Sequence, residues 1–335
     1  MFKVKEGLLI GNKQVTGDGP TEILTVMDVG EMAFRNNITQ TDLDIGSLGF
    51  RNKIINGSMI VAARATSATV TASGYAALDR WGYASNGTFS TTISRQDFTA
   101  GTELEVGLYN YQRLNITSAS SQTYHQLYQC IEFVRTFNGK QVTLSFWAKA
   151  DAARSVTLGL HQNFGSGGST QVDTSVGTAN LSTAWQKFKY TVTLPSISGK
   201  TIGTNNYLAL AINFPLNTVS TFDITGVQLE EGTVASSFEH RDLCFETMLC
   251  ERFFKKIEIY GGGYGTASMS VIGLHVVPTT MRANPTATSI SNYGNVNVSD
   301  PTVVTSATEG LFWQATVTAA GRWAIDHGYS LTAEF

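Results

Sequence analysis

Strict alternation of apolar and polar residues over four segments is the feature that most constrains how this chain folds. The segments cover residues 143–149, 155–164, 185–194 and 207–214. In each one, apolar side chains recur at every second position, which is typical of β-strands that bury one face of a sheet only. Strands of this kind, separated by Gly- and Ser-rich segments, predict a jelly-roll-like antiparallel β-sandwich.

Composition favours the same class and argues against several others. Charged residues make up 15% of the 335 residues, whereas an ordinary soluble domain has about 25%. The net charge of −3 and the scattered Lys and Arg residues argue against a nucleic-acid partner. No apolar run approaches the roughly 18 residues of a transmembrane helix, so we expect no membrane insertion. The first residues lack the features of a signal peptide, so we expect synthesis in a cytoplasm.

The chain is predicted to be mainly β and to have four parts. They are an N-terminal arm (residues 1–49), the β-sandwich (50–239), a connecting α-helix (240–256) and a small C-terminal β domain (257–335). The arm is too small to build its own core. Ser236 or Ser237 is expected to cap the helix, because Glu239 follows at a spacing that suits a capping box.

Three segments resemble a known family when they are taken together. They read RNKIINGSM with ALDRWGY (residues 51–59 and 77–83), YQCIEFVRTFNGKQVTLSFWAKA (128–150) and FDITGVQLEEGTVASSFEHRDLCFETMLCERFF (222–254). This combination resembles the carbohydrate-binding-module-like β-sandwich of tail fibre proteins of tailed bacteriophages, in which a Cys-containing helix follows. The ending YSLTAEF (329–335) resembles the final strand of tail fibre C-terminal domains. The resemblance covers about residues 50–335.

The resemblance implies a non-enzymatic, receptor-binding tail fibre subunit. Such fibres are usually homotrimers, so we expect a homotrimer in the virion that mediates attachment to the host cell and binds host surface polysaccharide. Residues 1–49 are expected to bind a tail or baseplate adaptor, and residues 257–335 to form the distal tip. A trimer also agrees with the apolar residues on more than one side of the helix, which are Phe245, Met248, Leu249, Phe253 and Phe254.

Sequence motifs for catalysis and for cofactor binding are missing, so we expect neither enzyme activity nor a cofactor. Glu230 and Glu231 are adjacent, so on a strand they would point to opposite faces and could not act as a glycosidase pair. We interpret these two residues as the solvated end of a strand. Two alternatives stay open: a purely structural tail connector without a ligand, and a polysaccharide-modifying enzyme.

Sugar recognition needs aromatic faces for stacking and amides or hydroxyls for directed hydrogen bonds. In the sandwich, we expect one such surface on the face opposite the core, formed by Trp147, His161, Asn163, Tyr207 and Asn213. In the C-terminal domain, the candidates are Tyr260, Tyr264 and Tyr329. An alternative role for Trp147 is packing against a neighbouring subunit. Trp313 shares a face with Leu311 and Val317 and is predicted to be a core residue.

One residue is a minor candidate for a calcium ligand. In sandwich modules related by the resemblance, an acidic residue near the last strand can help to hold Ca²⁺, and Asp223 is near that position. The acidic partner expected shortly after the first strand is replaced by Ser58 or Met59. The sequence therefore predicts no metal site.

Overall fold

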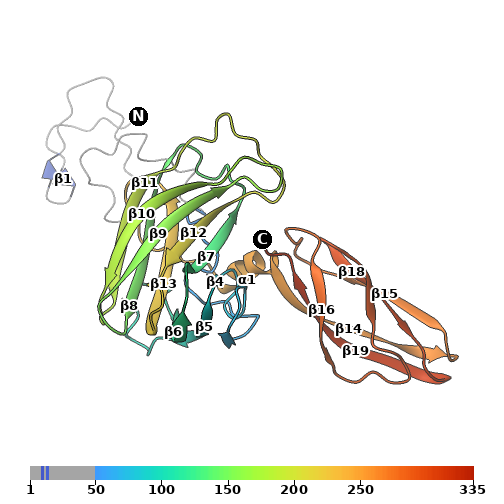
Figure 1. Cartoon of the computed structure of the whole chain (residues 1–335). Helices are drawn as coiled ribbons and strands as arrows, with labels where there is room; N and C mark the ends of the chain where they lie inside the picture. The colour runs from blue at the N-terminus through green and yellow to red at the C-terminus, as the bar shows by residue number, and fades with distance from the viewer. Residues whose placement is uncertain (1–8, 11–12, 15–49) are drawn as a thin grey trace. The chain divides into compact units, whose positions relative to one another are not determined.

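The computed structural model describes residues 9–10, 13–14 and 50–335, and Phe50–Phe335 form one compact unit (Figure 1). The predicted arm, residues 1–49, lies outside the described residues except for two short paired strands, β1 (Leu9–Ile10) and β2 (Lys13–Gln14). The described part is mainly β, as the alternation predicts, with one helix, α1 (Leu243–Glu251). No helix among these residues has the length and apolar character needed to cross a membrane.

Two antiparallel sheets face each other in the first part of Phe50–Phe335 and confirm the predicted β-sandwich (Figure 1). The five-stranded sheet has the order β10-β9-β12-β7-β4, with bounds Val172–Leu181, Arg154–Asn163, Tyr207–Asn213, His125–Glu132 and Gly82–Ser85. The six-stranded sheet has the order β11-β8-β13-β6-β5-β3, with bounds Gln186–Thr193, Gln141–Ala150, Ser220–Glu231, Asn110–Ser120, Thr88–Asp97 and Ser67–Val70.

The sandwich core lies between these sheets and is built from the alternating apolar residues. Phe146 of β8, Leu160 of β9 and Leu210 of β12 are completely buried and belong to one hydrophobic cluster. Burial of a side chain of this size stabilises the fold by about 2 kcal/mol. The opposite side chains of β9 and β12 are therefore left on the outer face of the five-stranded sheet, where they are available to a ligand.

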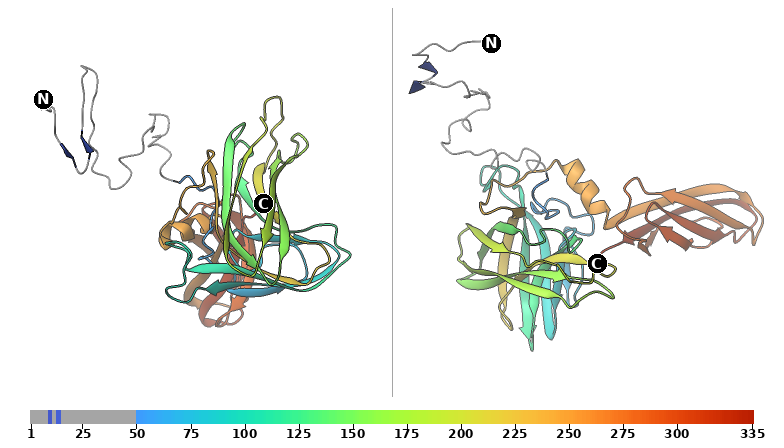
Figure 2. Two further views of the ribbon diagram at one scale, coloured as in Figure 1. Left: turned by 90° about the vertical axis from the view of Figure 1, so that its left-hand side faces the viewer. Right: turned by 90° about the horizontal axis from the view of Figure 1, so that it is seen from above.

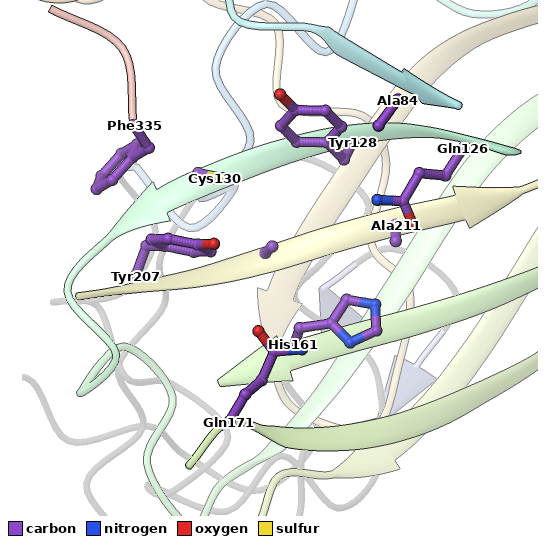
Figure 3. Close-up of a pocket in the computed structure, with 10 residues that line it drawn as sticks. Ala84, Gln126, Tyr128, Cys130, His161, Gln171, Tyr207, Ala211 and Phe335 are labelled. Atoms are coloured by element: carbon purple, nitrogen blue, oxygen red, sulfur yellow. The ribbon is translucent and has the colours of Figure 1, made fainter. Parts of the chain in front are cut away.

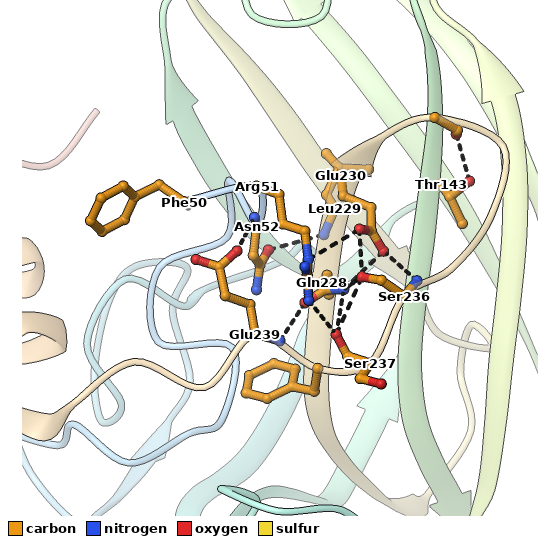
Figure 4. A network of polar contacts seen from close by, with 12 residues as sticks. Phe50, Arg51, Asn52, Thr143, Gln228, Leu229, Glu230, Ser236, Ser237 and Glu239 are labelled. Carbon is orange, nitrogen blue, oxygen red and sulfur yellow. Dashed lines mark hydrogen bonds and ion pairs between the residues drawn. The ribbon is translucent and has the colours of Figure 1, made fainter. Parts of the chain in front are cut away.

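A polar network joins the beginning and the end of the sandwich (Figure 4). The Asn52 side chain accepts a hydrogen bond from the Leu229 backbone amide at 3.0 Å, and the Asn52 backbone amide donates to the Glu239 carboxylate at 2.8 Å. Glu230 accepts hydrogen bonds from the backbone and the hydroxyl of Ser236, at 2.9 and 2.6 Å. Glu230 is also buried. The prediction that it is solvated is therefore wrong, because the chain after β13 folds back over it.

The helix is shorter than predicted at both ends. It begins at Leu243 and ends at Glu251, and Phe254 already belongs to the next strand, where it pairs with Thr332. This strand pairing overrides the helical spacing of the apolar residues. Ser236 does not cap the helix, because its hydroxyl binds Glu230. Phe253 and Phe254 are buried within their own chain, so they are not the intersubunit helix residues that the sequence predicted.

The C-terminal domain consists of two three-stranded antiparallel sheets, whose long orange and red strands are seen from two further sides in Figure 2. One sheet has the order β14-β19-β16, with bounds Phe254–Gly265, Gly321–Thr332 and Thr286–Asn292. The other has the order β15-β18-β17, with bounds Ser270–Val276, Gly310–Thr316 and Thr302–Ala307. Trp313 and Leu311 are buried in a second hydrophobic cluster, which confirms the predicted core position of Trp313.

Candidate functional site

The outer face of the five-stranded sheet carries a hollow of about 310 Å³ (Figure 3). This volume is at the lower end of the range of small-molecule sites, about 300–1,000 Å³. Strands β4, β7, β9 and β12 supply most of its lining, and one further residue follows β19. The ten lining residues are Ala84, Gln126, Tyr128, Cys130, His161, Gln171, Tyr207, Ala209, Ala211 and Phe335.

Strand register explains why these residues meet. Ala209 of β12 pairs with Cys130 of β7 on one side and with His161 of β9 on the other. Two positions further along β12, Ala211 pairs with Tyr128 in the same way. Residues paired across antiparallel strands share a face, so these side chains all point outward. The short alanine side chains lie between longer ones, and this difference in length creates the hollow.

His161 lies down over its own strand rather than standing away from it. A β-carbon added to Gly159 would lie only 3.1 Å from His161 Nε2. The imidazole Nδ1 lies 2.6 Å from Asp173 Oδ1, on the adjacent strand β10. The glycine and the carboxylate together fix the ring at the edge of the hollow.

A string of polar side chains continues from this imidazole along the rim. Gln171 Nε2 donates to Asp173 Oδ1 at 2.7 Å, and Asn163 Nδ2 donates to Gln171 Oε1 at 3.0 Å. Hydrogen bonding, first from His161 and then from Gln171, holds the pKa of Asp173 below its usual value. The carboxylate is therefore ionised at neutral pH and orders the rim, with amide groups left beside the hollow for a polar ligand.

Two phenol groups supply the aromatic surface on the other side. Burial raises the pKa of Tyr128 to about 12 and raises the pKa of Tyr207 above its ordinary value. Both hydroxyls therefore stay protonated at neutral pH and can donate as well as accept hydrogen bonds. A ring with a neutral hydroxyl suits a sugar, which presents an apolar ring face bordered by hydroxyl groups.

The sandwich candidates do not all lie in one place. His161 and Tyr207 line the hollow. Asn163 and Asn213 are on the same face of the sheet but outside the lining, and the Asn213 amide donates to the Thr157 carbonyl at 3.2 Å. Trp147 belongs to β8 of the opposite sheet, where its indole donates to Glu105 at 2.8 Å. The expectation of one surface containing Trp147 is therefore wrong.

The three C-terminal candidates also separate. Tyr260 and Tyr264 lie four residues apart on β14 and are 65% and 82% exposed, so both rings are open to contact. Tyr329 is only 3% exposed, and its hydroxyl donates to the Pro301 carbonyl. Tyr329 is consequently a core residue, which corrects its assignment as a ligand contact.

Asp223 forms ion pairs with two positively charged side chains of the same chain. Its carboxylate accepts two hydrogen bonds of 2.8 Å from the Arg113 guanidinium, and Lys149 Nζ lies 3.5 Å away. These two positive charges compensate the carboxylate and would repel Ca²⁺, which argues against the calcium role. Over residues 50–335, no group of three or more His, Cys, Asp and Glu side chains is arranged to hold a metal.

Sequence reasoning missed several lining residues. Gln126, Tyr128 and Cys130 alternate along residues 125–132, and this pattern was a usable signal for an outward face. Gln171 lies just before β10 and reaches the hollow through the pairing of β10 with β9. No pattern in the sequence marks Phe335 as a residue of the hollow, because it follows the last strand of a different domain.

Three solved structures illustrate the folds to which this chain is similar. One is a carbohydrate-binding module of family 4 (19% identity, TM-score 0.33), covering 53% of this chain and 98% of that one. Another is the family 11 carbohydrate-binding module of the cellulase Lic26A-Cel5E from Clostridium thermocellum (13% identity, TM-score 0.31), covering 50% of this chain and 97% of that one. The third is the enzymatically active domain of tailspike protein 4 of bacteriophage CBA120 (13% identity, TM-score 0.35), covering 54% of this chain and 22% of that one.

No curated protein sequence matches the chain. Residues 82–205 match the family model of a carbohydrate binding domain. This region includes six of the ten lining residues of the hollow.

Proposed function

We propose that this protein is a tail fibre subunit of a tailed bacteriophage that attaches to host cell-surface glycan through the hollow, without cleaving it. One observation carries the glycan assignment. The hollow combines aromatic rings with amide and imidazole groups, and most of its lining lies inside the region that matches a carbohydrate binding domain. The fibre assignment is supported by the sequence segments that resemble tail fibre proteins.

The chemistry of the lining favours a neutral glycan. Tyr128 and Tyr207 offer faces for stacking, and Gln126 and Gln171 offer both donors and acceptors. His161 is the only histidine of the lining, and Asp173 already binds it. Stacking and neutral hydrogen bonds depend little on salt, whereas interactions between exposed charges are screened. Binding should therefore vary little with ionic strength.

Binding without cleavage is supported by the same lining. A glycosidase needs two carboxyl groups on either side of the scissile bond, and none of the ten lining residues is Asp or Glu. Burial raises the pKa of Cys130 to about 12, so its thiol is protonated at neutral pH and is a poor nucleophile. The residues of the hollow are suited to holding a sugar rather than to activating water.

An array of bacterial surface polysaccharides tests the proposal directly. The unaltered protein should bind at least one polysaccharide, and Tyr207→Ala should weaken that binding about tenfold, as expected for loss of a stacking ring. Tyr109→Ala is the matched control, because this half-exposed tyrosine lies outside the hollow. The site assignment fails if Tyr207→Ala and the control bind equally. Release of sugar or acetate from the bound polysaccharide would contradict the non-catalytic assignment and favour an enzyme.

Attachment to the virion belongs to the same proposal. We assign the tail or baseplate adaptor contact to residues 1–49 and the distal tip to residues 257–335. Removal of residues 1–45 should leave Phe50–Phe335 folded, since this part forms a compact unit of its own. The shortened protein should not be incorporated into phage particles. Normal incorporation would reject the arm assignment.

The tip offers a second contact surface. Tyr260 and Tyr264 share the exposed face of β14, and along a strand their α-carbons are separated by about 13 Å. Tyr264→Ala should reduce binding to host cells if the tip contributes. A structural connector, the remaining alternative, predicts that no version of the protein binds host cells at any salt concentration.

Self-association as a homotrimer is supported by the outer face of the β15-β18-β17 sheet. Ile272, Leu274 and Val276 occupy alternate positions of β15 and are all more than half exposed. Leu274 pairs with Phe312 of the neighbouring strand, so the apolar surface extends across the sheet. Exposed apolar surfaces that are contiguous mark contacts with another protein. We assign this face to contacts between copies of the chain.

A further inference from the structure

Phe335 lines the hollow although it belongs to a different domain from the other nine lining residues (Figure 3). The chain leaves β19 after Thr332 and lies against the sandwich. The ring centroid of Phe335 is 5.1 Å from that of Tyr207, and the two rings are inclined at 61°. An edge-to-face pair of this kind is a favourable aromatic arrangement. Tyr207 and Phe335 together form the aromatic wall at one end of the hollow.

Buried ion pairs fix Glu334, the residue before Phe335. The Glu334 carboxylate lies 2.9 Å from the Arg64 guanidinium and also pairs with Arg80. Arg80 is itself buried, with its guanidinium 3.4 Å from the centroid of the Phe253 ring. Arg80 also donates to the carbonyl of Cys130, a lining residue of the hollow. These contacts connect the chain end rigidly to β7 of the sandwich.

Arg282 fixes the ring itself. Its guanidinium lies 4.0 Å from the centroid of the Phe335 ring. The same group donates hydrogen bonds of 2.7 Å to the carbonyls of Ala333 and Glu334. The ring is therefore stacked on a cation, and the same cation binds the backbone of the two residues before it, so little conformational freedom remains to be lost when a ligand binds.

From this geometry we infer that Phe335 is a specificity-determining residue of the glycan site, which favours longer glycans over short ones. The inference rests on the proposed glycan-binding function. Tyr128, Gln126 and His161 surround the part of the hollow away from Phe335 (Figure 3). A short fragment can occupy that part alone, whereas a longer chain continues past Tyr207 and meets the Phe335 ring. The C-terminal domain thus contributes one wall to a site whose remaining residues belong to the sandwich.

The test compares fragments of two lengths. The full-length protein is titrated with two-residue and four-residue fragments of the array polysaccharide that it binds most strongly. Phe335→Ala should weaken binding of the four-residue fragment about fivefold to tenfold, the value of one aromatic contact. Binding of the two-residue fragment should change less than twofold. Phe335→Trp should restore binding of the longer fragment, and Phe335→Leu, which retains apolar volume but no ring, should not.

Each outcome bears on the inference. Equal weakening for both fragments, or no weakening for either, would overturn it while leaving the glycan-binding function in place. Failure of the unaltered protein to bind any array polysaccharide would remove the proposed function and the inference with it. The midpoint of thermal unfolding should be similar for Phe335→Trp and Phe335→Leu, because both retain apolar volume at this position. Any difference in binding between Phe335→Trp and Phe335→Leu then reports on the ring alone.

Discussion

The ring of Tyr128 lies across Gly82, its partner on the neighbouring strand, so closely that a β-carbon on Gly82 would be 2.3 Å from Tyr128 Cζ. No side chain fits in that space. Gly82 therefore allows Tyr128 to lie flat over β4 at the edge of the hollow, with its ring in position for stacking.

Substitution of Gly82 should therefore act on glycan binding through Tyr128. Gly82→Ala should displace the ring and weaken binding about threefold to tenfold, as Tyr128→Ala should. The added methyl group should also destabilise the fold by about 1–3 kcal/mol through overpacking. Titration with the array polysaccharide measures the first effect, and urea unfolding measures the second. In the Tyr128→Ala background, Gly82→Ala should cause no further loss of binding. A second, equal loss would mean that Gly82 acts independently of the ring.

His125 should make the protein less stable in mild acid. Its ring is buried, with Nε2 2.5 Å from the Tyr83 hydroxyl, and burial lowers its pKa to about 4. In the unfolded chain the pKa of a histidine is about 6.5. Between these values the unfolded state binds more protons, so the free energy of unfolding falls as the pH falls from about 6.5 to about 4, by roughly 3 kcal/mol in total.

Urea unfolding at pH 7.5 and pH 5 measures this loss. His125→Gln should reduce the difference in unfolding free energy between the two pH values. His161→Gln is the control, since His161 is partly exposed on the rim. An unchanged pH dependence in His125→Gln would show that other groups cause the acid sensitivity.

The alternation in the sequence was sufficient to predict four strands of the sandwich, β8, β9, β11 and β12, and the side chains of each that face outward. It could not predict which sheet a strand joins. Trp147 and His161 both point away from the core, but β8 and β9 belong to opposite sheets. His161 therefore lines the hollow, whereas Trp147 lies on the other sheet and does not. Alternation with a period of two distinguishes core-facing from outward-facing side chains. The assignment of a strand to one sheet or the other depends on pairings between distant segments.

Long-range contacts also explain the other errors. The burial of Glu230 depends on Arg51, about 180 positions earlier, and on the return of Ser236. The residues that carried the family resemblance are mainly structural: the Asn56 side chain, for example, donates to the carbonyls of Val61 and Asp79. Of these residues, only Tyr128, Cys130 and Phe335 line the hollow, and the resemblance does not distinguish them from the structural ones.

Glu334 should contribute strongly to stability because of the charges it neutralises. Glu334→Ala would remove the ion-pair partner of the buried Arg80 guanidinium and would leave Arg64 with Asp79, 3.8 Å away. Removal of one member of a buried ion pair costs about 3–5 kcal/mol. The exposed pair of Lys140 and Glu231 provides the control, and Glu231→Ala should cost less than about 1 kcal/mol. Urea unfolding of both variants checks the difference. Similar values for the two would mean that Glu334 is not a structural anchor.

The apolar face of the C-terminal domain leads to the last prediction. We expect the unaltered protein to have a mass in solution three times that of its 36.2 kDa chain. Leu274→Glu should lower this mass, because it places a charge in the centre of the exposed apolar row of β15, and burial of an unpaired charge in an interface is strongly unfavourable. Thr288→Glu is the matched control, since Thr288 is exposed on the polar outer face of the other sheet.

Light scattering after size-exclusion chromatography, at micromolar concentration, separates the possible outcomes. A trimer that is unaffected by Thr288→Glu and weakened by Leu274→Glu supports contacts through β15. A trimer that resists both changes places the contacts elsewhere in the chain and rejects this face. A single chain of 36.2 kDa in the unaltered protein would reject the homotrimer itself. Avidity is the reason this result matters for function: three weak glycan sites that engage together can bind roughly 10²–10⁴ times more tightly than one.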